Sequence, residues 1–522
     1  MLHKPLGKRA VVFHDPNYPQ PCSEETLHTL IPGEFHLVEA SHLAEALTQD
    51  CNILISFHGP YFPKSAWAAI LRFLEAGGNL ALFGGMPFTR PVTEQGTIEP
   101  EQQAYTDQMH LGPFFPLALP ATDLSLVASR EATFLESCPL SLPSAQPGRF
   151  WSCYPQMTQA SDHPEDLGSA GPLDTLLTPL LFVNTPSSPA PLATPAALFD
   201  QQHGRFKGGR WLVSAWQPSS EDAWLANTSA IRQLIQLAAE GCAVLDVYPA
   251  LACYQTGEQP ELKIAARTPH DLRVSIKVST PRGELLAAFE TELAGSPFLQ
   301  EVRKQLPVAS EPGLYNIEAC YARGVSLRQQ SGFWLWDGAL VETTRNARLT
   351  AGRDYFYQQG EPFPICGTTY MDSRVQRKFL YLPNPARWDL DFAAMKEGGI
   401  NLIRTGIWTA WRELMPVAGF AQEAALRTLD AFVMTACKHQ VQVIFTFFSF
   451  FPPLFEGQNP WLDPRSIEGQ LDFVTMLARR YRNVELVSWD LINEPSFGDP
   501  ARIFAQRPLP NHDPYERIAF QR

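Results

Sequence analysis

The feature that most constrains this chain is a fourfold alternation of strand-like and helix-like segments that begins near residue 346. Short apolar runs typical of buried strands alternate with longer amphipathic runs typical of helices. The strand-like runs are FPICGTTYM, INLIRTGIW, VQVIFTFFSFF and VELVSWDLINEP. The helix-like runs are WDLDFAAMKEGG, EAALRTLDAFVMTACKHQ and IEGQLDFVTMLARRYR. This repeat predicts parallel strands joined by crossover helices.

Two arrangements can accommodate the repeat, a (β/α)₈ TIM barrel and a doubly wound sheet. Each strand-like run leads into a loop rich in Trp, Phe, Pro or charge, and the region contains no Gly-rich phosphate loop. These features favour the barrel, whose active site lies at the carboxyl ends of its strands. A whole barrel takes about 250 residues, so we expect 346–522 to form a partial barrel, its N-terminal half.

Two further domains are expected before this region. Residues 1–244 contain strand-like CNILISFHGPYF and NLALFGG on either side of the helical run SAWAAILRFLEAGG, which predicts an α/β domain with a parallel sheet. The Pro-, Ser- and Thr-rich stretch 86–202 within it gives no clear pattern. Residues 245–345 contain alternating runs such as LRVSIKVST and GLYNIEACYA, which predict an all-β sandwich of immunoglobulin-like size.

The first domain resembles the flavodoxin-like, glutamine-amidotransferase-like domains attached to some large glycosidases. The runs that carry this resemblance are ILISFHGPYF, FLEAGGNLALFGG and RWLVSAWQP. A working amidotransferase needs a Cys nucleophile on a tight strand-to-helix turn, paired with a His. The turn after NLALF reads Gly84-Gly85-Met86, and Cys51 precedes a strand. We therefore expect this domain to be non-catalytic and to pack, to mediate oligomer contacts or to shape a neighbouring cleft.

Composition excludes several classes of function. The formal net charge of the 522 residues is −13, which argues against nucleic acid and anionic membranes as partners. The nine Cys are scattered singly without a CxxC pair, so we expect no zinc site and no dense disulfide framework. No metal, nucleotide or flavin site is apparent in the sequence, so we expect no cofactor. The N-terminal MLHKPLGKRAVVF has no signal-peptide core, and no run approaches the length of a membrane span. Together these features predict a cytoplasmic protein.

The main candidate site is the pair Asn493-Glu494, at the end of the fourth strand-like run of the C-terminal region. A carboxylate at the mouth of a barrel is costly to bury unless it has a task. Pro495 fixes the backbone immediately after it. Asn493 can hydrogen-bond a sugar hydroxyl or orient a second carboxylate.

The segments WDLINEP and IRTGIW resemble the clan A glycoside hydrolases, which are retaining (β/α)₈ enzymes of cellulase-like, mannanase-like and β-galactosidase-like families. The resemblance covers roughly 346–522. It implies that Glu494 is the general acid/base, that Asn493 is its partner, and that Arg404 is the clan's arginine near the nucleophile. It also implies hydrolysis of a β-linked saccharide by double displacement.

Three aromatic residues are further candidates for binding a sugar. Trp408 ends the second strand-like run and Trp411 lies just beyond it, and both can stack on sugar faces, although packing explains loop aromatics equally well. Tyr370 lies at the end of the first strand-like run and can line the cleft. Simpler explanations also exist for the charged candidates: Glu494 can begin a helix, and Arg404 can form an ion pair within the barrel.

The second carboxylate of a retaining pair is not apparent in the sequence. The clan places its nucleophile, a second Glu, after the seventh strand, and no strand-like run follows Glu494 before Arg522. The chain can be a fragment of a longer enzyme, a second chain can complete the barrel, or a reduced barrel can persist without activity. An open edge would also favour self-association. The alternatives are a non-catalytic carbohydrate-binding or scaffolding protein and an enzyme whose active site lies in the amidotransferase-like domain.

Overall fold

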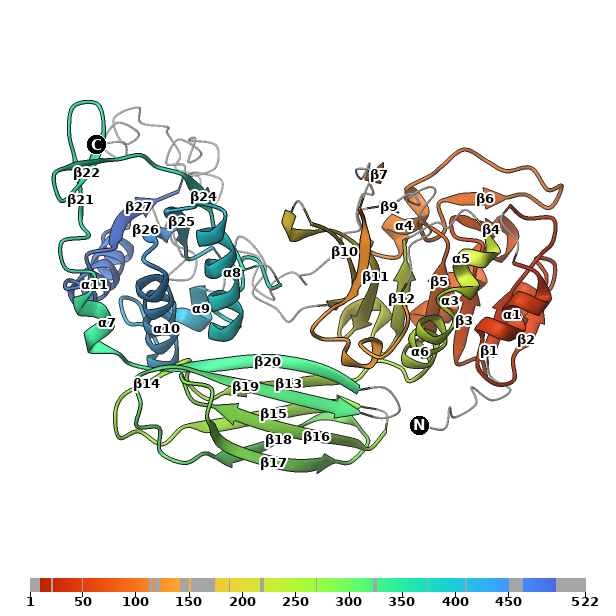
Figure 1. Cartoon of the computed structure of the whole chain (residues 1–522), viewed down its shortest axis with the longest axis horizontal. Helices are drawn as coiled ribbons and strands as arrows, with labels where there is room; N and C mark the ends of the chain where they lie inside the picture. Colours follow the sequence, from red (N-terminus) through yellow and green to blue (C-terminus); the bar gives the residue numbers. More distant parts are fainter. Residues whose placement is uncertain are drawn as a thin grey trace.

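The computed structural model describes most of the chain, in fourteen ranges. These are residues 10–19, 22–48, 50–111, 116–117, 123–140, 150–151, 174–186, 188–215, 220–268, 270–322, 326–372, 374–408, 411–449 and 463–493. The chain is multidomain and combines mixed α/β parts with a β-rich part (Figure 1). Glu494 lies outside the described residues.

The first unit is built on an eight-stranded sheet with the order β2-β1-β3-β5-β12-β11-β10-β8. Five neighbouring strands are parallel: β2 (His36–Val38), β1 (Ala10–Phe13), β3 (Ile53–Ser56), β5 (Asn79–Phe83) and β12 (Arg210–Ser214). The other three are antiparallel: β11 (Ser188–Gln201), β10 (Thr175–Thr185) and β8 (Ser125–Ala128).

Helices cover both faces of this sheet, because its strands are apolar on both sides. Val12 and Ile55 pack with α1 (Glu24–Leu30), α5 (Glu221–Leu225) and α6 (Thr228–Ala239). Val11 and Leu54 pack on the opposite face with α2 (Leu43–Ala46) and α3 (Trp67–Glu75). The predicted helix in SAWAAILRFLEAGG is confirmed as α3. Smaller elements are β4 (Tyr61–Pro63), β6 (Arg90–Val92), α4 (Ala104–Gln108), β7 (Pro116–Leu117) and β9 (Phe150–Trp151).

The β-rich part consists of two sheets that share one apolar core, in which Ile264 of one sheet lies with Ile276 of the other. The three-stranded sheet contains β13 (Val244–Pro249), β15 (Glu261–Thr268) and β18 (Ser296–Gln305). The five-stranded sheet contains β14 (Cys253–Tyr254), β20 (Ser326–Leu335), β19 (Gly313–Ala322), β16 (Leu272–Ser279) and β17 (Leu285–Leu293).

The C-terminal unit has a four-stranded parallel sheet in which the strands follow one another in chain order. They are β24 (Gly367–Thr369), β25 (Leu402–Gly406), β26 (Gln442–Phe448) and β27 (Val487–Ile492). Its long helices are α8 (Pro385–Glu397), α10 (Glu423–His439) and α11 (Pro464–Arg480). The predicted alternation of strands and helices is therefore confirmed. Shorter elements are α7 (Gly338–Glu342), β21 (Leu349–Ala351), β22 (Phe356–Gln358), β23 (Glu361–Phe363) and α9 (Trp411–Leu414).

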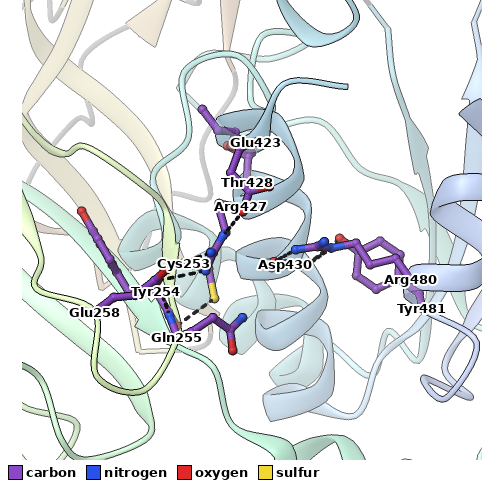
Figure 2. Close-up of polar contacts among 11 residues, drawn as sticks. Cys253, Tyr254, Gln255, Glu258, Glu423, Arg427, Thr428, Asp430, Arg480 and Tyr481 are labelled. Carbon is purple, nitrogen blue, oxygen red and sulfur yellow. Dashed lines mark hydrogen bonds and ion pairs between the residues drawn. The ribbon is translucent and has the colours of Figure 1, made fainter. Parts of the chain in front are cut away.

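The long helices pack on a single face of this sheet. Phe392 of α8, Phe432 of α10 and Phe473 of α11 share one core with the strands. Figure 1 shows where these three helices lie in the unit. Within the same layer, the Asp430 carboxylate of α10 accepts hydrogen bonds from Arg480 and from the hydroxyl of Tyr481 (Figure 2).

The β-rich part and the C-terminal unit are joined by specific contacts. The guanidinium of Arg427 on α10 donates to both carboxylate oxygens of Glu258, at 2.9 and 3.1 Å (Figure 2). The indole N–H of the buried Trp334 donates to the hydroxyl of Thr435 at 3.0 Å. Trp334 and Cys253 also belong to the apolar core of the C-terminal unit. This shared core holds α10, and therefore the sheet beneath it, against the β-rich part.

Candidate functional site

The candidate site extends from the middle of β25, β26 and β27 toward their carboxyl ends, and Asn493 directly follows β27. The register pairs Thr446 with Asp490 across β26 and β27. Their chain neighbours Phe445 and Trp489 point to the helix side, where both line a small apolar cavity with residues of α10 and α11. Because side chains alternate along a strand, Thr446 and Asp490 point to the other face of the sheet. Polar side chains from neighbouring strands therefore meet on the face opposite α8, α10 and α11.

Arg404 is the centre of a hydrogen-bonded network on that face. Its Nη2 and Nε donate to Oδ2 of Asp490 at 2.7 and 3.2 Å. Its Nη1 and Nη2 both donate to Oδ1 of Asn493 at 3.1 Å. The hydroxyl of Thr446 donates to the same Oδ2 of Asp490 at 2.8 Å. Three strands thus contribute to one polar cluster.

The backbone holds Asn493 at this position. Its N–H donates to the carbonyl oxygen of Phe448 at 2.8 Å, which extends the pairing between β26 and β27 by one step. The cluster is open to solvent, since the side chains of Arg404 and Asp490 are 32% and 29% exposed. Arg404 and Asp490 carry opposite charges, so this pair has no net charge when both are ionised.

Trp408 lies beside the cluster. Cζ of Arg404 is 5.8 Å from the centre of the indole ring, which is the geometry of a cation–π contact. Trp408 is buried, and its indole N–H has no hydrogen-bond partner in the part of the chain that the structure describes. A buried donor without a partner is unusual in a folded protein. Trp408 therefore has a spare donor close to Arg404.

The backbone N–H of Tyr370 donates to the carbonyl oxygen of Arg404 at 2.8 Å, but the side chain of Tyr370 lies on the helix side of the sheet, away from this cluster. It is buried among Phe379, Phe392 and Phe432 in the layer between strands and helices, and its hydroxyl donates to Asp391 of α8 at 3.0 Å. Burial raises the pKa of the phenol above its ordinary value. These contacts are those of a core residue.

Two predicted residues cannot be placed. The side chain of Trp411, the first residue of α9, and the whole of Glu494 lie outside the described residues. Glu494 directly follows Asn493 in the sequence.

Sequence reasoning did not identify Asp490 and Thr446. Both lie inside strand-like runs, where a polar residue at an alternating position is the available signal. Asp490 is two positions from Ser488, and the pair alternates with the large apolar Trp489. This pattern indicates a polar face but does not reveal which residue of another strand lies on it.

The described residues contain no helix that is long and apolar enough to span a bilayer. Within the same residues, no group of three or more His, Cys, Asp or Glu side chains is arranged to hold a metal ion.

No protein-family model matches the sequence, and no curated protein matches it. Among solved structures, a β-glucuronidase from Bacteroides uniformis is 15% identical with a TM-score of 0.19, over 48% of this chain and 28% of that one. A Parabacteroides merdae β-glucuronidase is 13% identical with a TM-score of 0.22, over 53% of this chain and 31% of that one. An exo-β-1,4-mannosidase from Opitutaceae bacterium strain TAV5 is 19% identical with a TM-score of 0.26, over 30% of this chain and 31% of that one.

This chain therefore spans about a third or less of the length of these solved structures. Their TM-scores are too low to support an argument about the fold or the activity of this chain.

Proposed function

We propose that the C-terminal unit is part of a (β/α)₈ barrel and that it carries the acid/base half of a retaining β-glycosidase site. Glu494 is the proposed general acid/base, with Asn493 and Arg404 beside it. The observation that carries the proposal is the cluster of Arg404, Asp490 and Asn493 at the carboxyl edge of a parallel sheet. That edge is where barrel enzymes bind and convert their substrates.

The sheet itself favours a barrel over a doubly wound arrangement. Its four strands follow one another in chain order, and α8, α10 and α11 pack on one face. Doubly wound sheets carry helices on both faces, as the sheet of the first unit does. In a barrel, the face opposite the helices becomes the interior.

The chemistry follows from the roles of the two carboxyl groups of a retaining glycosidase. These groups stand about 5–5.5 Å apart. One protonates the leaving oxygen while the other attacks the anomeric carbon, and the first then activates the water that releases the sugar. Glu494 takes the proton-transfer role in our proposal, and we assign no residue to the nucleophile. Trp408 is proposed to contact the sugar, because its N–H lacks a partner beside Arg404 among the described residues.

The test compares aryl and alkyl β-glycosides as substrates of the wild type and of Glu494→Gln. Loss of a general acid costs about 10²–10⁴-fold in rate. This loss is expected for alkyl leaving groups, which need a proton, and is expected to be much smaller for dinitrophenolate, which leaves without one. The matched control is Glu485→Gln, because Glu485 precedes β27 at the opposite end of the strand and accepts from the N–H of Asn346.

An equal response of the two leaving-group classes to Glu494→Gln would refute the acid/base assignment. Saccharide binding in a calorimeter without turnover by the wild type would instead support the alternative of a non-catalytic carbohydrate-binding protein.

A further inference from the structure

Asp490 makes contacts that the proposed reaction does not by itself require. Its Oδ2 accepts from Nε and Nη2 of Arg404 and from the hydroxyl of Thr446. One carboxylate oxygen thus receives three hydrogen bonds from two neighbouring strands. Charge-assisted hydrogen bonds of this kind are short and directional, so they restrict the plane of the guanidinium.

The orientation of Arg404 in turn determines the orientation of the Asn493 amide. Both terminal nitrogens of the guanidinium donate to Oδ1 of Asn493. Since a guanidinium has only donors, the oxygen end of the amide must face it. The NH₂ end of Asn493 has no partner within the described residues and is therefore left as a donor.

We propose that Asp490 is a positioning residue of this site. Asp490 orients Arg404 so that Asn493 presents its NH₂ group, and the negative charge of Asp490 balances the positive charge of Arg404. The inference rests on the proposed glycosidase function and deepens it by indicating the substrate class. An arginine that is paired with an aspartate 2.7 Å away has little attraction left for a carboxylate on the substrate. The site is thus suited to neutral β-glycosides and not to uronides.

The first measurement uses the selectivity of the full chain. Asp490→Asn removes one negative charge beside Arg404 and keeps the size of the side chain. We expect kcat/KM for an aryl β-glucoside to fall, and the ratio of β-glucuronide to β-glucoside turnover to rise by about tenfold or more, because the unpaired guanidinium attracts the uronate. A purely structural role of Asp490 would lower both activities in parallel.

The second measurement needs no activity. In protein labelled with nitrogen-15 arginine, the Nε–H signal of Arg404 is assigned by its loss in Arg404→Lys. Asp490→Asn is expected to speed hydrogen exchange of this proton about tenfold or more, since its acceptor is weakened. Thr446→Val removes only the supporting hydroxyl and is expected to have a smaller effect in the same direction.

The matched control is Asp389→Asn, which breaks an ion pair with Lys438 between α8 and α10, where the Asp389 side chain is 22% exposed. It is expected to leave both readouts unchanged. An unchanged Arg404 signal in Asp490→Asn overturns the positioning role, whether or not the wild type is active. Faster exchange of the Arg404 proton in Asp490→Asn, combined with an absence of glycosidase activity in the wild type, supports the positioning role and refutes the proposed function.

Discussion

The sheets of the first and C-terminal units both present polar residues at the carboxyl ends of their parallel strands, but only one of these edges is open. In the first unit, His14, Asp15 and His58 follow β1 and β3, and all three are buried. In the C-terminal unit, Arg404 and Asp490 are about a third exposed. The carboxyl edge is where such sheets bind ligands.

Hydrogen bonding explains how the first edge is closed. The N–H of Asp15 donates to Nε2 of His58 at 3.1 Å, and Nδ1 of His58 donates to the carbonyl oxygen of Pro19 at 3.2 Å. The Asp15 carboxylate accepts from the backbone N–H groups of Asn17 and Ala40. These polar groups satisfy one another. Polar residues at a strand end therefore indicate a site only where hydrogen-bonding capacity and access remain.

The largest expected effect is on the stability of the closed edge, in Gly59→Ala. A Cβ at Gly59 would lie 2.2 Å from the carbonyl oxygen of Gly84, and Gly59 has φ +59°. We expect a loss of more than about 3 kcal/mol in the free energy of unfolding, because steric overlap adds to backbone strain. Denaturant unfolding of the variant and of the wild type measures this loss.

Gly96→Ala separates the two causes. Gly96 has φ +77°, but among the described residues no atom lies within 4 Å of the position that a Cβ would take, so this variant is expected to lose only about 1 kcal/mol. Equal losses of unfolding free energy in the two variants would contradict the close packing of the turn at Gly59 against the turn at Gly84.

At the open edge, Arg404→Lys is expected to lower activity and to leave stability almost unchanged. Lysine cannot bridge Asp490 and Asn493 as the planar guanidinium does. We expect kcat/KM on β-glycosides to fall about 100-fold, while the free energy of unfolding changes by less than about 1 kcal/mol. A large loss of stability with unchanged activity would mean that this edge is structural, like the first.

The elements of the C-terminal unit could be predicted because their apolar periodicity is local. Their starts were less clear: α8 and α11 begin at Pro385 and Pro464, after the capping side chains of Asn384 and Asp463. An Asx-Pro pair is a readable start signal. The β10–β11 hairpin was not predicted, because prolines interrupt both strands and its register shifts repeatedly.

The candidate site shows the same division between local and long-range information. Asn493 could be named because it lies at the end of a strand-like run, and Arg404 could be named because the segment IRTGIW carries the resemblance to clan A. Asp490 lies within a run, and its contact with Arg404 crosses β26 between them. That contact depends on the register of three strands, which a single sequence does not specify.

The next effect in size is the pH dependence of the closed edge. Burial lowers the pKa of His58 to about 4. An unfolded His has a pKa near 6.5, so below that pH the unfolded state gains a proton that the folded state does not bind. Stability is therefore complete above pH 7 and is expected to fall by about 2 kcal/mol between pH 7 and pH 5.

Urea unfolding at a series of pH values measures this loss, and His58→Gln is the comparison, because its amide can accept from Asp15 and donate to Pro19 without titrating. A slope between pH 7 and pH 5 that survives unchanged in His58→Gln would assign the effect to other groups.

The smallest expected effect comes from a matched pair of hydroxyl deletions, one at each edge. Oγ of Ser56 on β3 accepts from the N–H of His58 at 3.3 Å, and the hydroxyl of Thr446 on β26 donates to Asp490 at 2.8 Å. Ser56→Ala leaves the His58 N–H buried without its acceptor, which costs about 1–2 kcal/mol. Thr446→Val leaves Asp490 in contact with Arg404 and water, so we expect a loss below about 1 kcal/mol. Denaturant unfolding of both variants measures whether water can replace a lost hydrogen-bond partner at the open edge. Equal losses of stability in the two variants would show that the two edges are equally closed to water.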